Sequence, residues 1–128
     1  MFQKIIITAF TVFSLQALAT EQPVSVEKTV PINDALVPKS SKANEEVKVV
    51  VSGLFSNGCY SYDRAEVKHI EDQVHTVSVI ANVSQGMCIM ALVPFTKEVN
   101  LGTLSTGNHT VRFLSGDGTY MERSVFVE

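Results

Sequence analysis

Val74-His-Thr-Val77-Ser-Val79-Ile-Ala81-Asn-Val83 is the stretch that decides the fold of this chain. Its apolar side chains recur at every second position, at Val77, Val79, Ala81 and Val83. This is the period of an extended strand, so all four lie on one face. Polar turns bound the stretch on both sides, at 71–73 and 84–86. The pattern therefore predicts a β-strand with one buried face.

Similar strand patterns recur through residues 47–128, and turn-forming residues separate them. The predicted strands are 47–51, 59–70, 74–83, 88–95, 98–101, 109–114 and 120–127. The fourth is apolar on both faces, so we expect it at the centre of a sheet, with Pro94 at an edge or a bulge. Seven short strands in about eighty residues predict an all-β sandwich, because one sheet of that size leaves a face uncovered.

The first nineteen residues have the composition of a secretory signal peptide. A weakly basic start, an apolar run over 5–15 and the small residues Ala17 and Ala19 follow in order, so we expect cleavage after Ala19. The apolar run is shorter than the ~20 residues that a spanning helix needs. We therefore expect a periplasmic or secreted protein that does not insert into a membrane after cleavage.

Cys59 and Cys88 are the only cysteines in the chain. In an oxidising compartment, two lone thiols most often pair. The sequence therefore predicts one Cys59–Cys88 disulfide, which would support a small sandwich core.

Residues 20–46 differ in composition from the C-terminal part of the chain. They contain Pro23, Pro31 and Pro38 and no aromatic residue, which predicts an extended linker before a domain at 47–128. An alternative is an N-terminal arm that lies along a sheet edge, because Val24 and Val26 alternate as in a strand.

The charge and the motifs exclude several function classes. A net charge of −3 argues against nucleic acid or an anionic membrane surface as the main partner. No nucleophile elbow and no phosphate-binding glycine loop occur, so we expect no enzyme and no cofactor. Glycosylation sequons start at Asn82 and Asn108, and the sequence leaves their use open.

Two protein-binding surfaces are candidates. Tyr60, Tyr62 and Arg64 would share one face of the second predicted strand, and tyrosine and arginine are typical of binding hot spots. The second candidate is an inhibitory loop held beside Cys88, made of Ser84, Gln85, Gly86 and Met87.

His69 and His75 form the one constellation with possible metal chemistry. If residues 71–73 make a three-residue turn, the two imidazoles face each other across a hairpin. The alternative is that His75 lies at the edge of the core while His69 faces solvent. We therefore predict no metal site, and keep a metal-binding hydrolase as the weakest hypothesis.

The segment from Leu104 to Phe113 resembles a segment common in bacterial immunoglobulin-like sandwiches. Leu104, Gly107 and Val111 match that pattern, whereas His109 occupies the position where tyrosine is usual. The resemblance implies an immunoglobulin-like β-sandwich and no activity.

The resulting hypothesis is a non-enzymatic binding or structural module that contacts another envelope or extracellular protein. A secreted protease inhibitor is the alternative.

Overall fold

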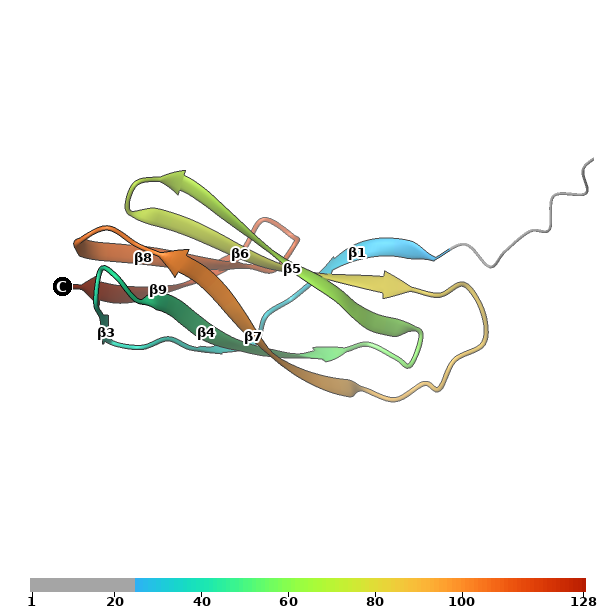
Figure 1. Ribbon diagram of the computed structural model, residues 1–128. Coiled ribbons are helices and arrows are strands. Elements are labelled where there is room, and N and C mark those ends of the chain that lie inside the picture. Colours follow the sequence, from blue (N-terminus) through green and yellow to red (C-terminus); the bar gives the residue numbers. More distant parts are fainter. Residues whose placement is uncertain (1–24) are drawn as a thin grey trace, which may run out of the picture.

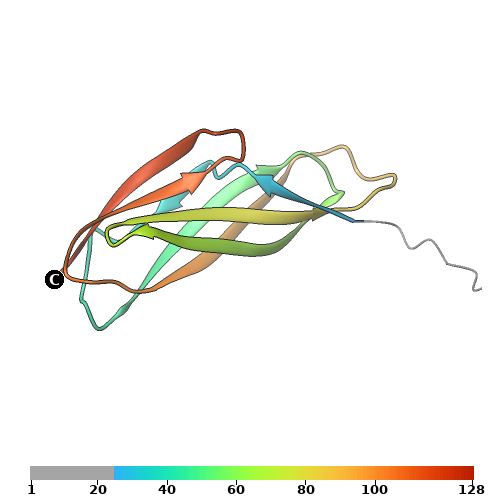
Figure 2. The ribbon, with the colours of Figure 1, turned by 90° about the horizontal axis from the view of Figure 1, so that it is seen from above.

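The computed structural model describes residues 25–128, which form two antiparallel-rich sheets packed face to face (Figures 1 and 2). The larger sheet contains β1 (Val26–Val30), β3 (Ser40–Ser41), β5 (Tyr60–Glu71), β6 (Val74–Val83), β8 (Gly107–Leu114) and β9 (Tyr120–Val127). The smaller sheet contains β2 (Asp34–Leu36), β4 (Glu46–Phe55) and β7 (Val93–Thr103). The predicted all-β class and sandwich are confirmed, with nine strands in place of seven.

Strand β6 lies at the centre of the larger sheet and has the bounds that the sequence predicts. It pairs with β5 along one edge. Its other edge is shared, because β8 pairs in parallel with residues 74–77 and β1 pairs antiparallel with residues 79–83. Every residue from His75 to Ala81 is buried as a result.

The core lies between the two sheets and is built from alternating residues of both. Strand β4 contributes Val47, Val49 and Val51, which are at most 1% exposed. The larger sheet contributes Val77, Val79, Ala81, Val111, Phe113, Val125 and Val127. Period-two burial in β4 and β8 is the physical reason why these sequences fold as facing strands, whereas β6 is buried continuously from His75 to Ala81.

The predicted linker is wrong for residues 26–41, which form three strands of the sandwich. Strand β1 pairs with β6, so the alternative of an arm on a sheet edge is nearer to the structure. Val30 and Ile32 enter the core, at 3% and 4% exposure. Pro31 and Pro38 lie between strands, where a missing backbone donor costs no ladder hydrogen bond. The predicted signal peptide, residues 1–19, lies outside the described residues.

The predicted strands 88–95 and 98–101 are also corrected. One strand, β7, replaces both, and residues 84–92 form a loop. Strand β7 is an edge strand whose one ladder partner is β4, and it is not central. Pro94 does lie on an edge strand, as its chemistry requires. No helix in residues 25–128 has the length and apolarity needed to cross a membrane.

Candidate functional site

The loop that connects β6 to β7 carries the three most exposed large apolar side chains of the described residues, Met87, Met90 and Ile89, and also Leu92. We call residues 84–92 the apolar loop. Met87, Ile89, Met90 and Leu92 are 104%, 77%, 85% and 65% exposed. No residue of the loop is charged. The loop protrudes from the end of the sandwich opposite the C-terminus (Figures 1 and 2).

Three attachments hold the backbone of the apolar loop. The predicted Cys59–Cys88 disulfide is present, with 5.3 Å between the two Cα atoms. The Gly58 N–H donates a hydrogen bond to the Ile89 carbonyl at 2.8 Å, and the Ser84 N–H donates to the Cys59 carbonyl at 3.0 Å. The loop is therefore fastened to the turn before β5 while its side chains point away from the core.

The residues of the predicted inhibitory loop, Ser84 to Met87, are all exposed. The apolar surface continues past them to Leu92, which the sequence analysis missed. An apolar run that is continuous on both faces is typical of a buried strand. Residues 84–92 contain no charged residue, and an uncharged apolar stretch can be either a buried strand or an exposed loop.

Tyr60, Tyr62 and Arg64 do not share one face. The ladder between β5 and β6 shifts by one residue between Tyr62 and Arg64, and this bulge reverses the side-chain alternation. Tyr60 and Tyr62 are half-buried against the core, and the Tyr60 ring lies 5.9 Å from the Phe55 ring. Arg64 is consequently on the opposite, outer face of β5.

Arg64 is engaged by carboxylates of its own chain. It donates to both carboxylate oxygens of Glu27 at 3.0 and 3.1 Å, to Glu66 at 3.1 Å, and to Asp63. The hydrogen bonds and charge of Arg64 lower the pKa of the Glu27 carboxyl. The same contacts raise the pKa of Arg64. Arg64 thus links β5 to β1 across β6.

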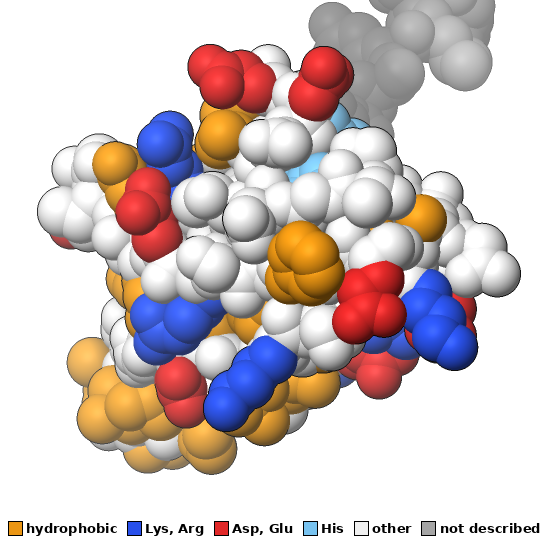
Figure 3. All heavy atoms as spheres, turned by 90° about the vertical axis from the view of Figure 1, so that its left-hand side faces the viewer, with side chains coloured by type: hydrophobic (Ala, Val, Ile, Leu, Met, Phe, Trp, Pro, Cys, Tyr) orange, Lys and Arg blue, Asp and Glu red, His pale blue; other side chains and the backbone are white. Residues whose placement is uncertain are grey.

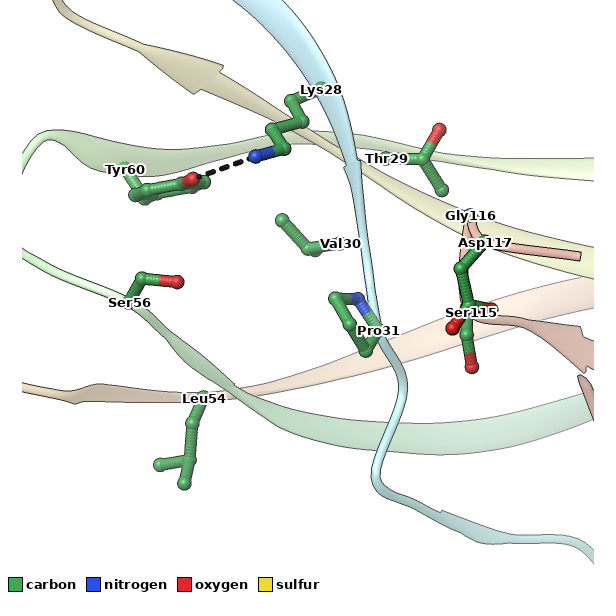
Figure 4. A pocket seen from close by; sticks show the side chains of 10 residues that line it. All are labelled: Lys28, Thr29, Val30, Pro31, Leu54, Ser56, Tyr60, Ser115, Gly116 and Asp117. Carbon is green, nitrogen blue, oxygen red and sulfur yellow. Dashed lines mark hydrogen bonds between the residues drawn. The ribbon is translucent and has the colours of Figure 1, made fainter. Parts of the chain in front are cut away.

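A hollow of about 300 Å³ lies beside β1 and is shown in Figure 4. Its polar groups make contacts within the fold. Lys28 donates to the Tyr60 hydroxyl at 3.3 Å. Hydrogen bonds from Thr119 to Asp117 lower the pKa of that carboxyl. We assign this hollow no ligand.

The three histidines of the chain form a hydrogen-bonded series that crosses the larger sheet. His69 Nδ1 lies 2.6 Å from His75 Nδ1, and His75 Nε2 lies 2.8 Å from His109 Nδ1. His109 Nε2 donates to the Ser105 carbonyl at 2.6 Å. His69 is exposed, whereas His75 and His109 are 2% and 1% exposed. We call these three rings and the Ser105 carbonyl the histidine chain.

The geometry makes His69 and His75 a hydrogen-bonded pair. They are directly opposite in the β5–β6 ladder, as predicted. Two imidazole nitrogens bound to one tetrahedral metal would be about 3.3 Å apart, given metal–nitrogen bonds of about 2.05 Å. At 2.6 Å, the two Nδ1 atoms share a proton instead. Burial, and then the charges of His69 and His109, lower the pKa of His75.

His109 occupies the position where the resemblance expects tyrosine. Its Nε2 donates to a backbone carbonyl four residues upstream, which is the bond that the tyrosine hydroxyl makes in such corners. His109 therefore bonds both to the Ser105 carbonyl and to His75. The sequence could not show this contact, because 34 residues separate the two rings.

Comparison with known proteins identifies a family. Residues 49–126 match the family described as the ORF11 beta-sandwich domain. The match covers more than half of the chain and runs from β4 into β9. No curated protein and no solved structure shows significant similarity. The chain belongs to the ORF11 beta-sandwich domain family.

Proposed function

We propose that the protein is an exported, non-enzymatic binding module that docks its apolar loop into an apolar groove of another protein. One observation carries this proposal: four large apolar side chains project from a fastened loop that has no charged residue. Soluble proteins rarely leave such side chains clustered in water unless the cluster has a partner.

The energetics favour this loop over the tyrosine face. Burying one large apolar side chain stabilises a complex by about 1.5–3 kcal/mol. Most of this free energy is still available to the loop, because its four large apolar side chains are at least 65% exposed: Met87, Ile89, Met90 and Leu92. Tyr60 and Tyr62 are already partly buried against the core, so less of their apolar surface remains to be buried in a complex. Arg64 is paired with three carboxylates of its own chain.

Attachment of the loop backbone also favours binding. Ordering a flexible loop on association costs free energy, and a loop that is held before binding avoids much of this cost. The disulfide and the Gly58–Ile89 hydrogen bond hold the apolar loop at its middle. A disulfide further supports export, since such bonds persist in oxidising compartments. The corner bond of His109 supports an immunoglobulin-like arrangement.

Site-specific photocrosslinking in living cells tests the proposal. A photoreactive amino acid at Leu92, in the apolar loop, should give one discrete protein adduct. The same amino acid at Ile70, which is 58% exposed at the other end of the sandwich, should not. The double substitution Met87→Ser/Met90→Ser should abolish the Leu92 adduct. The matched substitution Ile70→Ser should leave it unchanged.

Two outcomes would contradict docking on a protein. The first is a Leu92 crosslinking pattern that is absent or insensitive to Met87→Ser/Met90→Ser. The second is a loop-dependent association with lipid vesicles of phosphatidylethanolamine and phosphatidylglycerol in sedimentation. The latter would assign the loop to a membrane surface instead.

A protease inhibitor is the second candidate, favoured by the full exposure of Met87 next to Cys88. An inhibitor of this kind presents one side chain to the specificity pocket of a protease. Titration against chymotrypsin-like and elastase-like proteases would show stoichiometric inhibition, which Met87→Asp should abolish. Absence of inhibition at micromolar concentrations would remove this candidate and leave the docking proposal unaffected.

A further inference from the structure

The Ser105 carbonyl fixes the direction of every hydrogen bond in the neutral histidine chain. A carbonyl only accepts, so His109 Nε2 carries a hydrogen and its Nδ1 is an acceptor. His75 must then donate from Nε2 to His109 and accept at Nδ1. His69 must donate from Nδ1. This leaves His69 Nε2, on the exposed ring, as the one unprotonated nitrogen that accepts no hydrogen bond within the histidine chain.

Counting hydrogens gives the capacity of the intact chain. Each of the two ring-to-ring contacts holds one hydrogen, and the bond to Ser105 holds a third. The His69 Nε2 position can hold a fourth. The neutral chain has three hydrogens, so it accepts one additional proton with all its bonds intact. A second additional proton would place two hydrogens in one contact of 2.6 or 2.8 Å and break it.

Among residues 25–128, the charged groups nearest to the histidine chain lie at its solvent end, in the β5–β6 turn. A shallow hollow of about 310 Å³ borders His69 and His75, and its charged side chains are Glu71 and Asp72 of the β5–β6 turn. The end of β7 contributes Thr103 to it, and the connection from β7 to β8 contributes Leu104 and Ser105. Figure 3 looks onto this end of the molecule and shows histidine atoms at the surface close below acidic side chains.

The smaller sheet and β9 contribute apolar core residues to the same end of the sandwich, apart from Thr103 at the hollow. Strand β9 places Val125 opposite His109 in the ladder, and the nearby core residues of β4 and β7 are Val47 and Leu101. Glu71 and Asp72 thus lie at the exposed end of the chain, next to His69, whereas His75 and His109 are almost fully buried, and burial disfavours the charged form of His75.

We propose that the histidine chain is an acid-sensitive clasp that accepts one proton from solvent and releases the β5–β6 turn from β8 when a second proton binds. The clasp joins three strands, because His69 is on β5, His75 on β6 and His109 on β8. Beside it, the short parallel pairing of β6 with β8 and the bond from Thr110 N–H to the Gln73 carbonyl hold the same junction.

The clasp makes stability depend on pH in a defined direction. An unfolded chain protonates all three histidines below their ordinary pKa of about 6.5, whereas the folded chain accepts one proton. Unfolding in acid therefore takes up two protons, and stability falls as the pH falls below about 6.5. The unfolding equilibrium constant should rise by up to roughly 100-fold for each pH unit below about 6.

NMR spectroscopy of the imidazole nitrogens in the wild-type protein is the first test, with a chelator present to exclude metal binding. At pH 7.5 we expect His69 as the Nδ1–H tautomer, and His75 and His109 as Nε2–H tautomers. Titration to pH 5 should add no more than one proton to the three rings while native signals persist. The Thr110 amide should lose exchange protection before the Asn33 amide, which bonds to the Ser52 carbonyl in the smaller sheet.

Urea unfolding between pH 7 and pH 5 is the second test. His75→Val breaks the chain at its middle, and should reduce the rise of the unfolding constant from roughly 100-fold toward roughly 10-fold per pH unit. His69→Asn keeps a donor at the position of Nδ1 for His75 and leaves the buried pair in place, so it should retain the wild-type pH dependence. If folded His75 took up a proton as readily as in the unfolded chain, His75→Val would shift stability equally at every pH.

Three results would overturn the proposal. They are a different set of tautomers, two protons bound by the folded chain, and equal pH dependence in the wild type and His75→Val. If His75→Val does not fold, the tautomers and the proton count of the wild type decide the matter alone.

Discussion

Gly53 illustrates how a single residue permits the packing of the smaller sheet. A Cβ atom at this position would lie 2.7 Å from the ring of Phe95 and 2.8 Å from the Pro31 carbonyl oxygen. Both distances are shorter than real carbon contacts. The absence of a side chain on Gly53 therefore lets β4 approach both β7 and the segment after β1.

Gly53→Ala should destabilise the protein by about 1–3 kcal/mol, because the added methyl group overpacks this contact. Gly86→Ala is the matched control, since a Cβ atom there meets nothing within 4 Å. It should change stability by less than about 1 kcal/mol. Urea denaturation of both variants measures the difference, and equal stabilities would contradict the close approach at Gly53.

At the residue scale, two kinds of contact could be predicted from the sequence: pairs that face each other across a short hairpin turn, and two lone cysteines that form a disulfide under oxidising conditions. Cys59–Cys88 and the facing pair His69–His75 belong to this group. Contacts that depend on the order of strands in the sheet could not be predicted. The bond between His75 and His109 requires β8 beside β6, and the Arg64–Glu27 pair requires β1 on the far edge of β6.

At the scale of the elements, strands whose sequence alternates apolar and polar residues between polar turns were predictable, and segments without that pattern were not. The bounds of β6 and β9 agree with the prediction, because polar turns flank clear alternating patterns. Residues 88–92 are apolar but largely exposed. Composition alone does not distinguish residues of a core from residues of an exposed apolar surface. The bulge beside Asp63 left no sequence signal and displaced Arg64 from the tyrosine face.

Strand β1 should contribute to the stability of the sandwich. Val30→Ala removes methyl groups from a side chain that is 3% exposed, and should cost about 1.5–3 kcal/mol. Val26→Ala is the control on the same strand, since Val26 is 50% exposed, and should cost less than about 1 kcal/mol. Urea denaturation compares the two. Equal small effects would restore the interpretation of this segment as a linker.

At the scale of the whole molecule, the sandwich separates two features at opposite ends. The loop between β6 and β7, which holds Cys88, lies at one end, and the β5–β6 turn lies at the C-terminal end (Figures 1 and 2). The histidine chain is next to that turn. The core between them is continuous, because the buried residues of both sheets form one cluster. A change at either end therefore acts on the stability of the entire domain.

Replacing both cysteines by serine should lower stability by about 3.5 kcal/mol, because the bond closes a loop with a sequence separation of 29 residues. At roughly 4–8 °C per kcal/mol, the melting temperature should fall by more than about 10 °C. Calorimetry with and without dithiothreitol measures the effect. Dithiothreitol should lower the melting temperature of the wild type and leave that of the double serine variant unchanged. An unchanged wild-type melting temperature would contradict a stabilising disulfide.

The position of the C-terminus has a practical consequence. Glu128 lies at the far end of the sandwich from residues 84–92 (Figures 1 and 2). A biotin or fusion partner attached after Glu128 would anchor the molecule on a sensor chip with Met87 and Met90 turned toward the flowing analyte. Immobilisation through this terminus is therefore the orientation in which surface plasmon resonance should detect the ligand of the loop without obstruction.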